Sequence, residues 1–188
     1  MKRAALRRSE LCAIELLALQ SFSSIYDLSA LRIPQLCLPV DVTFESFRGF
    51  IARTGASLPS PLPEGMTVRH GGRYVVLYDD RTENERRLAF TLAHELGHIM
   101  LGHAGECEEA EEREANAFAA SLLAPAVVFF YLAHRDGAPP SSEEMAVIFP
   151  LSRTAAENRR RDLLRRPPSP PTDAEIALLL HLFGKIAP

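Results

Sequence analysis

The sequence predicts an α+β protein in which a small antiparallel sheet packs on one long helix, with additional helices toward the C-terminus. Two β-rich runs, 66–70 and 73–78, flank Gly71-Gly72, which is typical of a tight hairpin. Several other segments repeat apolar residues at helical spacing. The chain has 188 residues, of which 47% are hydrophobic and 24% charged, so we expect one compact domain with a small extension.

Two segments before the hairpin are predicted to be helical. Residues 2–20 fit an amphipathic helix, because Glu10 and Glu15 interrupt its apolar stretch. Residues 42–54 fit a second helix. Within the hairpin, one set of alternating residues is expected to share a buried face: Met66, Val68, Tyr74, Val76 and Tyr78.

The long helix is predicted from about 83 to 103. Thr82-Glu83-Asn84-Glu85 has the pattern of a capping box, with Thr82 as the N-cap and Glu85 at N3. The positions that follow form an apolar stripe at helical spacing: Leu88, Leu92, Ala93, Leu96, Ile99 and Met100.

Further helices are predicted downstream. One runs from about 108 to Leu123 and is ended by Pro125, and a final helix to about Lys185 begins at the capping box of Thr172 and Glu175. Shorter helices are expected at 126–134, 142–149 and 153–165. The chain then divides into an N-terminal helical extension (1–40), a core (41–136), a further helical segment (137–166), and a Pro-rich linker with a C-terminal helix (167–188).

Composition indicates the cellular compartment and the classes of partner to be expected for the protein. The three cysteines, Cys12, Cys37 and Cys107, show no pairing pattern, which favours a reducing cytoplasm. The net charge of −3 argues against general affinity for nucleic acid. No apolar run approaches the ~20 residues that span a bilayer. We therefore expect a cytoplasmic protein without membrane association or direct nucleic-acid binding.

The pentapeptide His94-Glu95-Leu96-Gly97-His98 carries the strongest chemical signal. Two histidines four residues apart on a helix lie on one face, so both imidazoles can reach one ion. Glu95 points to a neighbouring sector, from which it can reach a water molecule at that ion. Two nitrogen ligands and a general base are the arrangement of a zinc hydrolase.

A third ligand is expected from the next helix, which begins with many carboxylates. On a helical wheel, Glu112 lies at the edge of the apolar face, Glu111 lies near it, and Glu114 points well away. We favour Glu112 as the ligand and leave Glu111 open. Asn116, one turn later, is the candidate to orient an imidazole as a second-shell residue. His103 is expected to be a surface residue at the helix end.

The segment from Phe90 to His98, together with the stretch from Glu112 to Pro125, resembles the ImmA/IrrE family of metallo-endopeptidases, whose second motif runs ExEANxFAxxLLxP. The stretch 145–156 also resembles the helix-turn-helix-like LAxxFxVSxxA segment of that family. The resemblance implies a zincin-like protease core. It places the metal ligands on His94, His98 and Glu112 and the catalytic carboxylate on Glu95.

The resemblance also implies a function. Such proteins are bacterial, cytoplasmic and zinc-dependent, and they relieve repression by cleaving a helix-turn-helix repressor during induction of phages and mobile elements or under stress. We expect one Zn²⁺ per chain, with Mn²⁺ as the alternative ion in the cell. Four residues are candidates for stabilising the transition state, and the sequence does not choose among them: Tyr74, Tyr78, Tyr131 and His134.

Two other functions stay open at this stage. One is an antirepressor that binds a repressor without cleaving it, although a retained Glu95 argues against a pure binder. The other is a DNA-binding regulator that uses the 143–165 element and a group of arginines that could meet phosphate: Arg159, Arg160, Arg161, Arg165 and Arg166.

Overall fold

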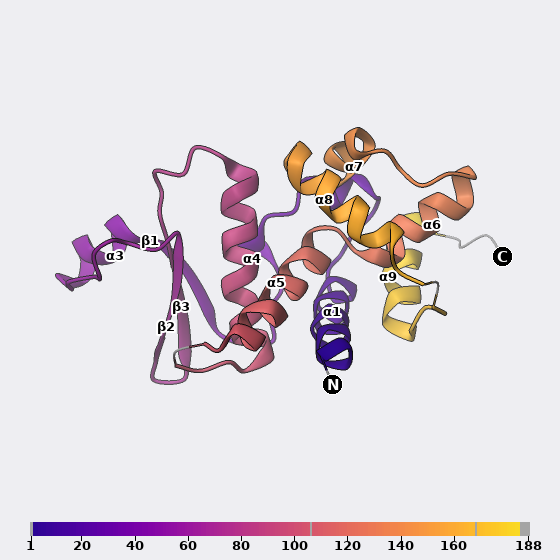
Figure 1. Ribbon diagram of the computed structural model, residues 1–188. Coiled ribbons are helices and arrows are strands. Elements are labelled where there is room, and N and C mark those ends of the chain that lie inside the picture. Colours follow the sequence, from indigo (N-terminus) through magenta and orange to yellow (C-terminus); the bar gives the residue numbers. More distant parts are fainter. Residues whose placement is uncertain (1, 106, 168, 185–188) are drawn as a thin grey trace.

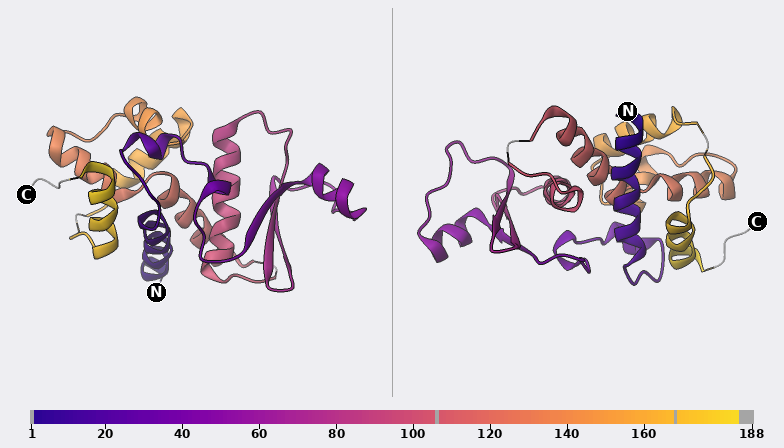
Figure 2. Two further views of the ribbon diagram at one scale, coloured as in Figure 1. Left: turned by 180° about the vertical axis from the view of Figure 1, so that it is seen from behind. Right: turned by 90° about the horizontal axis from the view of Figure 1, so that it is seen from below.

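The computed structural model describes residues 2–105, 107–167 and 169–184. Helix α4 stands between a small sheet on one side and most of the other helices on the opposite side (Figures 1 and 2). This arrangement confirms the predicted α+β class. In chain order the elements are α1 (Lys2–Ala18), α2 (Tyr26–Ser29), η1 (Ile33–Gln35), β1 (Val42–Ser46), α3 (Phe47–Thr54), β2 (Gly65–His70), β3 (Arg73–Tyr78), α4 (Glu85–Leu101), α5 (Glu109–Leu123), α6 (Ala126–Asp136), α7 (Ser142–Ile148), α8 (Arg153–Leu164) and α9 (Asp173–Phe183).

The sheet is mixed rather than purely antiparallel. Strands β2 and β3 form the predicted hairpin, but β1 pairs with β3 in parallel, giving the order β1-β3-β2. The prediction of one helix over 42–54 is therefore wrong in its first half. Val42, Thr43 and Phe44 are β-branched or aromatic residues that favour a strand. Ser46 then caps α3, its hydroxyl accepting from the backbone N–H of Gly49.

The hairpin register also corrects the predicted buried face. Gly71 and Gly72 both have positive φ, as a tight two-residue hairpin turn requires. This turn pairs Met66 with Leu77 and Thr67 with Val76. Even-numbered residues of β2 therefore share a face with odd-numbered residues of β3. As a result, Met66 and Val68 lie on the face opposite to that of Tyr74, Val76 and Tyr78.

The start of α4 differs from the prediction by two residues. Asn84 is the N-cap, and its side-chain oxygen accepts from the backbone N–H groups of Arg86 and Arg87. The expected cap at Thr82 is therefore wrong. Asn is as good a cap as Thr, and at Asn84 both bonds are made inside the first turn. The predicted capping box of α9, between Thr172 and Glu175, is confirmed; the predicted helix end at Lys185 lies outside the described residues.

The N-terminal and C-terminal helices pack into the same core as the middle of the chain. Helix α1 lies against α5, and α9 lies against α1 (Figure 2). Leu16, Leu17, Phe118, Leu122 and Leu178 are fully buried members of one apolar cluster. The four-segment division of the chain stays a prediction, although this cluster draws on all four segments.

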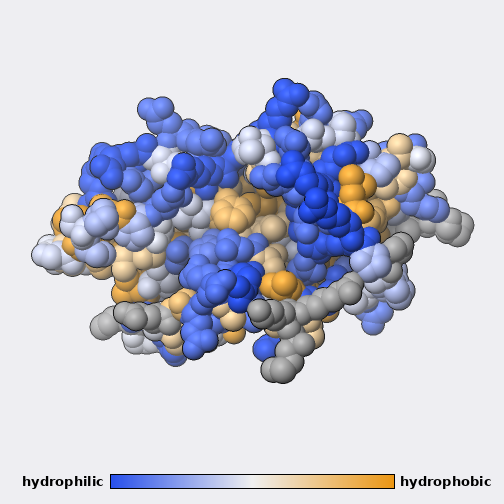
Figure 3. Space-filling model, viewed as in Figure 1, coloured by the Kyte–Doolittle hydropathy of each residue, from blue (hydrophilic) through white to orange (hydrophobic). Residues whose placement is uncertain are grey.

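The surface around this core is mostly hydrophilic on the face seen in Figure 3, with smaller apolar patches near its centre and toward both sides. Within the described residues, no single helix is long and apolar enough to cross a bilayer. Helices α5 and α6 reach that length and composition only together, with a bend of 42° between them.

Candidate metal centre

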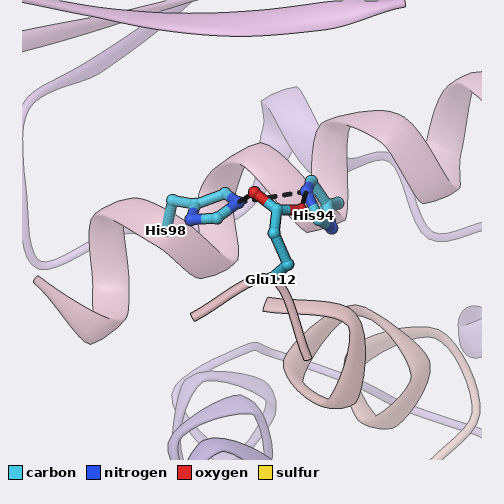
Figure 4. Close-up of side chains that lie close together, drawn as sticks. All are labelled: His94, His98 and Glu112. Atoms are coloured by element: carbon cyan, nitrogen blue, oxygen red, sulfur yellow. Dashed lines mark hydrogen bonds and ion pairs between the residues drawn. The ribbon is translucent and has the colours of Figure 1, made fainter. Parts of the chain in front are cut away.

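Three predicted ligand side chains converge where α4 crosses α5. His94 and His98 lie one turn apart on α4, and their Nε2 atoms are 3.0 Å apart. Glu112 reaches them from the first turns of α5. Its Oε2 lies 3.4 Å from Nε2 of His94, and its Oε1 lies 3.5 Å from Nε2 of His98. The carboxylate thus sits between the two imidazoles (Figure 4).

This donor set fits a zinc ion. Two imidazole nitrogens and a carboxylate oxygen are common zinc ligands, with bonds of ~2.0–2.1 Å, so tetrahedral ligand atoms lie about 3.3 Å from one another. The separations of 3.0, 3.4 and 3.5 Å are close to that spacing. In the described part of the chain, this is the one group of three such residues whose ligand atoms all lie within 4.8 Å of one another.

A close helix crossing brings Glu112 within reach. Gly97 faces Ala115, and a Cβ on Gly97 would lie 3.2 Å from the Cα of Ala115 and 3.1 Å from the ring of Phe118. The missing side chain therefore lets the two backbones approach, which places Glu112, three residues before Ala115, over the histidines. Sequence reasoning treated Gly97 only as a spacer in the pentapeptide. The sequence feature that could have indicated this close crossing is a glycine on the apolar side of the predicted helix.

Glu95 is held beside the ligands but is not one of the three converging groups. Thr67 on β2 donates a hydrogen bond of 2.8 Å to its Oε2. Gly65 permits this contact, since a Cβ there would lie 2.6 Å from the Thr91 side chain and 3.1 Å from Cγ of Glu95. Burial raises the pKa of Glu95 above its ordinary value, and the Thr67 hydrogen bond opposes part of that rise. A carboxylate with a raised pKa suits a general base near neutral pH. Thr67 and Gly65 were not singled out from the sequence.

A cavity of about 530 Å³ opens over these groups. Residues of β2, of α4 and of the loop after α4 line it, together with Glu112 of α5. Among the four candidates for transition-state stabilisation, Tyr74 lines this cavity. Tyr78 lines a different pocket, and Tyr131 packs against Phe183 with ring centroids 4.4 Å apart. His134 is exposed on α6.

The other acidic candidates on α5 have different partners. Glu111 accepts from the backbone N–H of Glu108 and completes the capping box of α5. Asn116 is exposed, and among the described residues no hydrogen bond joins it to an imidazole. Its orienting role stays a prediction. Nδ1 of His94 is the one buried side-chain polar atom without a hydrogen-bond partner in the described residues.

One expectation about the surroundings of the site is wrong. His103 is not a surface residue, because its side chain is only 6% exposed. Its Nδ1 lies 3.0 Å from Nδ1 of His98, and its Nε2 lies 3.4 Å from Oε2 of Glu114. Glu114, which was not favoured as a ligand, is not one of the converging side chains and contacts His103 instead. The helical wheel failed here because it did not include the chain reversal after α4, which folds His103 back over the helix.

His98 is the more enclosed of the two imidazoles. Burial lowers the pKa of His98 below its ordinary value, and the neighbouring His94 lowers it further. A neutral imidazole is the form that binds a metal ion, so both effects favour ligation.

Comparison with known protein families then identifies the chain. Residues 53–160, more than half of its length, match the family model of the IrrE N-terminal-like domain, a peptidase family. The chain belongs to this family. Membership supports the resemblance noted from the two motifs and indicates a metallopeptidase. No match was found among curated proteins or among solved structures.

The match begins in the last residues of α3 and ends within α8. It therefore includes the three converging side chains, Glu95, helix α7 and the first part of α8. Helix α1, strand β1 and helix α9 lie outside the matched span, although α1 and α9 contribute to the shared core.

Proposed function

We propose that this protein is a zinc-dependent endopeptidase that cleaves a helix-turn-helix transcriptional repressor and thereby relieves repression. The observation that carries the hydrolytic part is the arrangement of His94, His98 and Glu112 around one point, with Glu95 hydrogen-bonded beside them. Family membership supports peptide bonds as the substrate class. The repressor as partner rests on the resemblance to the ImmA/IrrE family.

His94, His98 and Glu112 would hold the ion, which supplies a Lewis acid that polarises a carbonyl group and acidifies water. Glu95 takes a proton from the attacking water and later gives it to the leaving amine. Thr67 occupies Oε2 of Glu95 and so leaves Oε1 for proton transfer. Tyr74 is the cavity-lining candidate to stabilise charge on the scissile carbonyl.

Strand β2 supports binding of an extended peptide. It is an edge strand, because the sheet order is β1-β3-β2, and four of its residues line the cavity: Gly65, Met66, Thr67 and Arg69. Its outer backbone groups can pair with a substrate segment by β-augmentation, next to Glu95. A flexible segment of a repressor can adopt this conformation more readily than a folded helix.

Three of the five arginines named for the DNA-binding alternative are engaged within the protein. Arg159 is buried and donates to the carbonyl oxygen of Ala124, while Arg160 donates to the carbonyl oxygen of Pro140. Arg166 forms an ion pair with Glu10. These guanidinium groups have partners within the protein and serve packing between elements.

The decisive experiment compares wild type with Glu95→Gln. Both proteins are loaded with zinc, and in parallel with manganese, and incubated with a candidate helix-turn-helix repressor while the mass of the repressor is followed. Wild type should cleave it, whereas Glu95→Gln should keep the metal and lose turnover by about three orders of magnitude or more, because the proton acceptor is gone.

Glu109→Gln is the matched control, because Glu109 is 87% exposed on α5 and its removal leaves the site intact. A stable complex with the repressor formed equally by wild type and Glu95→Gln, with no cleavage under either metal, would replace the peptidase with the antirepressor.

A further inference from the structure

The loop after α4 places a second histidine against the metal-facing helix. Helix α4 ends in a Schellman motif: Gly102 has φ 77°, its N–H donates to the carbonyl oxygen of Ile99, and the N–H of His103 donates to that of His98. In this motif the residue after the left-handed glycine regularly contacts the side chain five positions earlier. The backbone at the helix end therefore dictates that His103 lies over His98.

The side chains continue this contact into a chain of three groups. Nδ1 of His98 lies 3.0 Å from Nδ1 of His103, whose Nε2 lies 3.4 Å from Oε2 of Glu114. His103 is 6% exposed and Glu114 is 27% exposed, so neither group is free in solvent. The chain leads away from the ligand atom of His98, since Nε2 faces His94 and Glu112.

The proton positions on His98 and His103 follow from one requirement on the ligand nitrogen. A ligand nitrogen must present its lone pair, so His98 carries its proton on Nδ1 when Nε2 faces the ion. That N–H can donate to an unprotonated Nδ1 of His103. His103 then carries its proton on Nε2, which donates to the carboxylate of Glu114. Every N–H in the chain has an acceptor, and the negative charge stands at its far end.

We infer that His103 and Glu114 are positioning residues that hold His98 in the tautomer and orientation for metal binding. The inference rests on the proposed metal site. Outer-shell partners of this kind typically change metal affinity by ~10–100-fold. His94 lacks an equivalent, since its Nδ1 has no partner among the described residues, so His98 is the better-anchored ligand.

Cys107 is the competing explanation for the contact at His98. Its Sγ lies 3.3 Å from Nδ1 of His98. A thiol is a weaker acceptor than an imidazole nitrogen, and Cys107 makes no onward contact with a charged group in the described residues. Cys107→Ala therefore serves as a control and is expected to keep wild-type zinc affinity.

The test measures zinc affinity by competition with a chromophoric chelator, together with the visible spectrum of the cobalt-substituted protein. His103→Leu keeps the bulk but removes the acceptor, and should weaken zinc binding by ~10–100-fold and alter the cobalt spectrum. His103→Asn returns an oxygen near the position of Nδ1 and should recover much of the affinity. If His103 acted through packing alone, His103→Leu should bind zinc more tightly than His103→Asn.

Glu114→Ala is measured alone and in combination with His103→Leu. The comparison shows whether Glu114 affects zinc affinity through His103 or independently of it. Glu114→Ala should weaken binding in the wild-type background and add nothing to His103→Leu. Because Glu114 is partly exposed, Glu114→Ala tests the hydrogen-bonded series His98–His103–Glu114 even where His103→Leu folds poorly. Glu109→Ala controls for the lost charge on α5.

Three outcomes overturn the inference: wild-type affinity in His103→Leu, an equal effect of Glu114→Ala with and without His103, or an affinity loss in Cys107→Ala that matches that of His103→Leu. All three leave the proposed peptidase standing. Failure of the wild-type protein to bind zinc overturns both proposals. Normal zinc behaviour without any cleavage overturns the peptidase alone.

Discussion

Two regions of the molecule bury polar groups, and they differ in how those groups are satisfied. Where α8 packs on the end of α5, Arg159 donates to the carbonyl oxygen of Ala124 and to the hydroxyl of Ser121. Where α4 crosses α5, three ligand-type side chains face one another, and Nδ1 of His94 has no partner in the described structure. In the first region the buried guanidinium has its partners within the chain, whereas in the second three groups of metal-ligand type converge on one point.

The difference separates a structural polar cluster from a functional one. Burial lowers the pKa of Arg159 to about 10, so this group stays charged at neutral pH, and its hydrogen bonds offset the cost of burying it. At the α4–α5 crossing, the carboxylate of Glu112 and the two imidazoles form the donor set of a metal site, and a bound ion would stabilise their close approach. We therefore expect substitutions in the two regions to change different measurable quantities.

The largest effect is expected from the histidines. His94→Ala or His98→Ala should abolish stoichiometric zinc binding, because two protein ligands do not retain the ion. The unfolding free energy of the metal-free protein should change less for His94→Ala than for His98→Ala, because Nδ1 of His98 also contacts His103 and Cys107. Metal content after dialysis and denaturant unfolding of the apo protein measure both quantities. Full zinc retention in the double variant would falsify the site.

Arg159→Met should show the opposite pattern. Loss of the guanidinium leaves the Ala124 carbonyl and the Ser121 hydroxyl buried without a donor, at a cost of about 1–3 kcal/mol for each group. Zinc affinity should stay at the wild-type value. Arg161→Met, at an exposed position of the same helix, is the control and should change stability by less than ~0.5 kcal/mol. A drop in zinc affinity for Arg159→Met would contradict this comparison, because it would mean that the two regions are energetically coupled.

Gly97→Val tests the helix crossing that connects the fold with the site. The added side chain meets the Ala115 backbone and Phe118, so it should cost about 1–3 kcal/mol of stability through overpacking. It should also weaken zinc binding, because Glu112 moves away from the histidines with α5. Both effects are measured by unfolding with and without zinc. Stability loss with unchanged zinc affinity would show that Glu112 reaches the ion independently of this contact.

The smallest effect is expected from Thr67→Val, which removes the hydrogen bond to Glu95 and keeps the shape. Zinc affinity should be unchanged, and turnover should fall by roughly tenfold, equivalent to about 1.4 kcal/mol. Thr67 stabilises the ionised carboxylate, so its loss raises the pKa of Glu95 further. Because the carboxylate is the working form, the acid limb of the pH–rate profile should move to higher pH. An unshifted limb would mean that Thr67 does not act on the base.

Much of the helical framework, and the three side chains that converge at the α4–α5 crossing, could be predicted from the chain itself. Periodicity located α4 and α5, because helical faces are encoded over 10 to 20 neighbouring residues. The spacing of His94 and His98 places them on one face of any helix, and the wheel selected Glu112 by the same local geometry. The capping box at Thr172 was equally local, and so was the hairpin at Gly71-Gly72.

Tertiary structure decided the features that depend on pairing between distant segments. Strand β1 exists because β3 offers an edge, so 42–46 is a strand although 47–54 is a helix. The hairpin register, not alternation within each strand, assigned Met66 and Val68 to their face. Thr67, Gly65 and Gly97 meet the site only through contacts with α4 and α5. The reversal at Gly102 brought His103 and Glu114 to His98, a contact that no helical wheel contains, because a wheel describes one helix and ends where the chain turns.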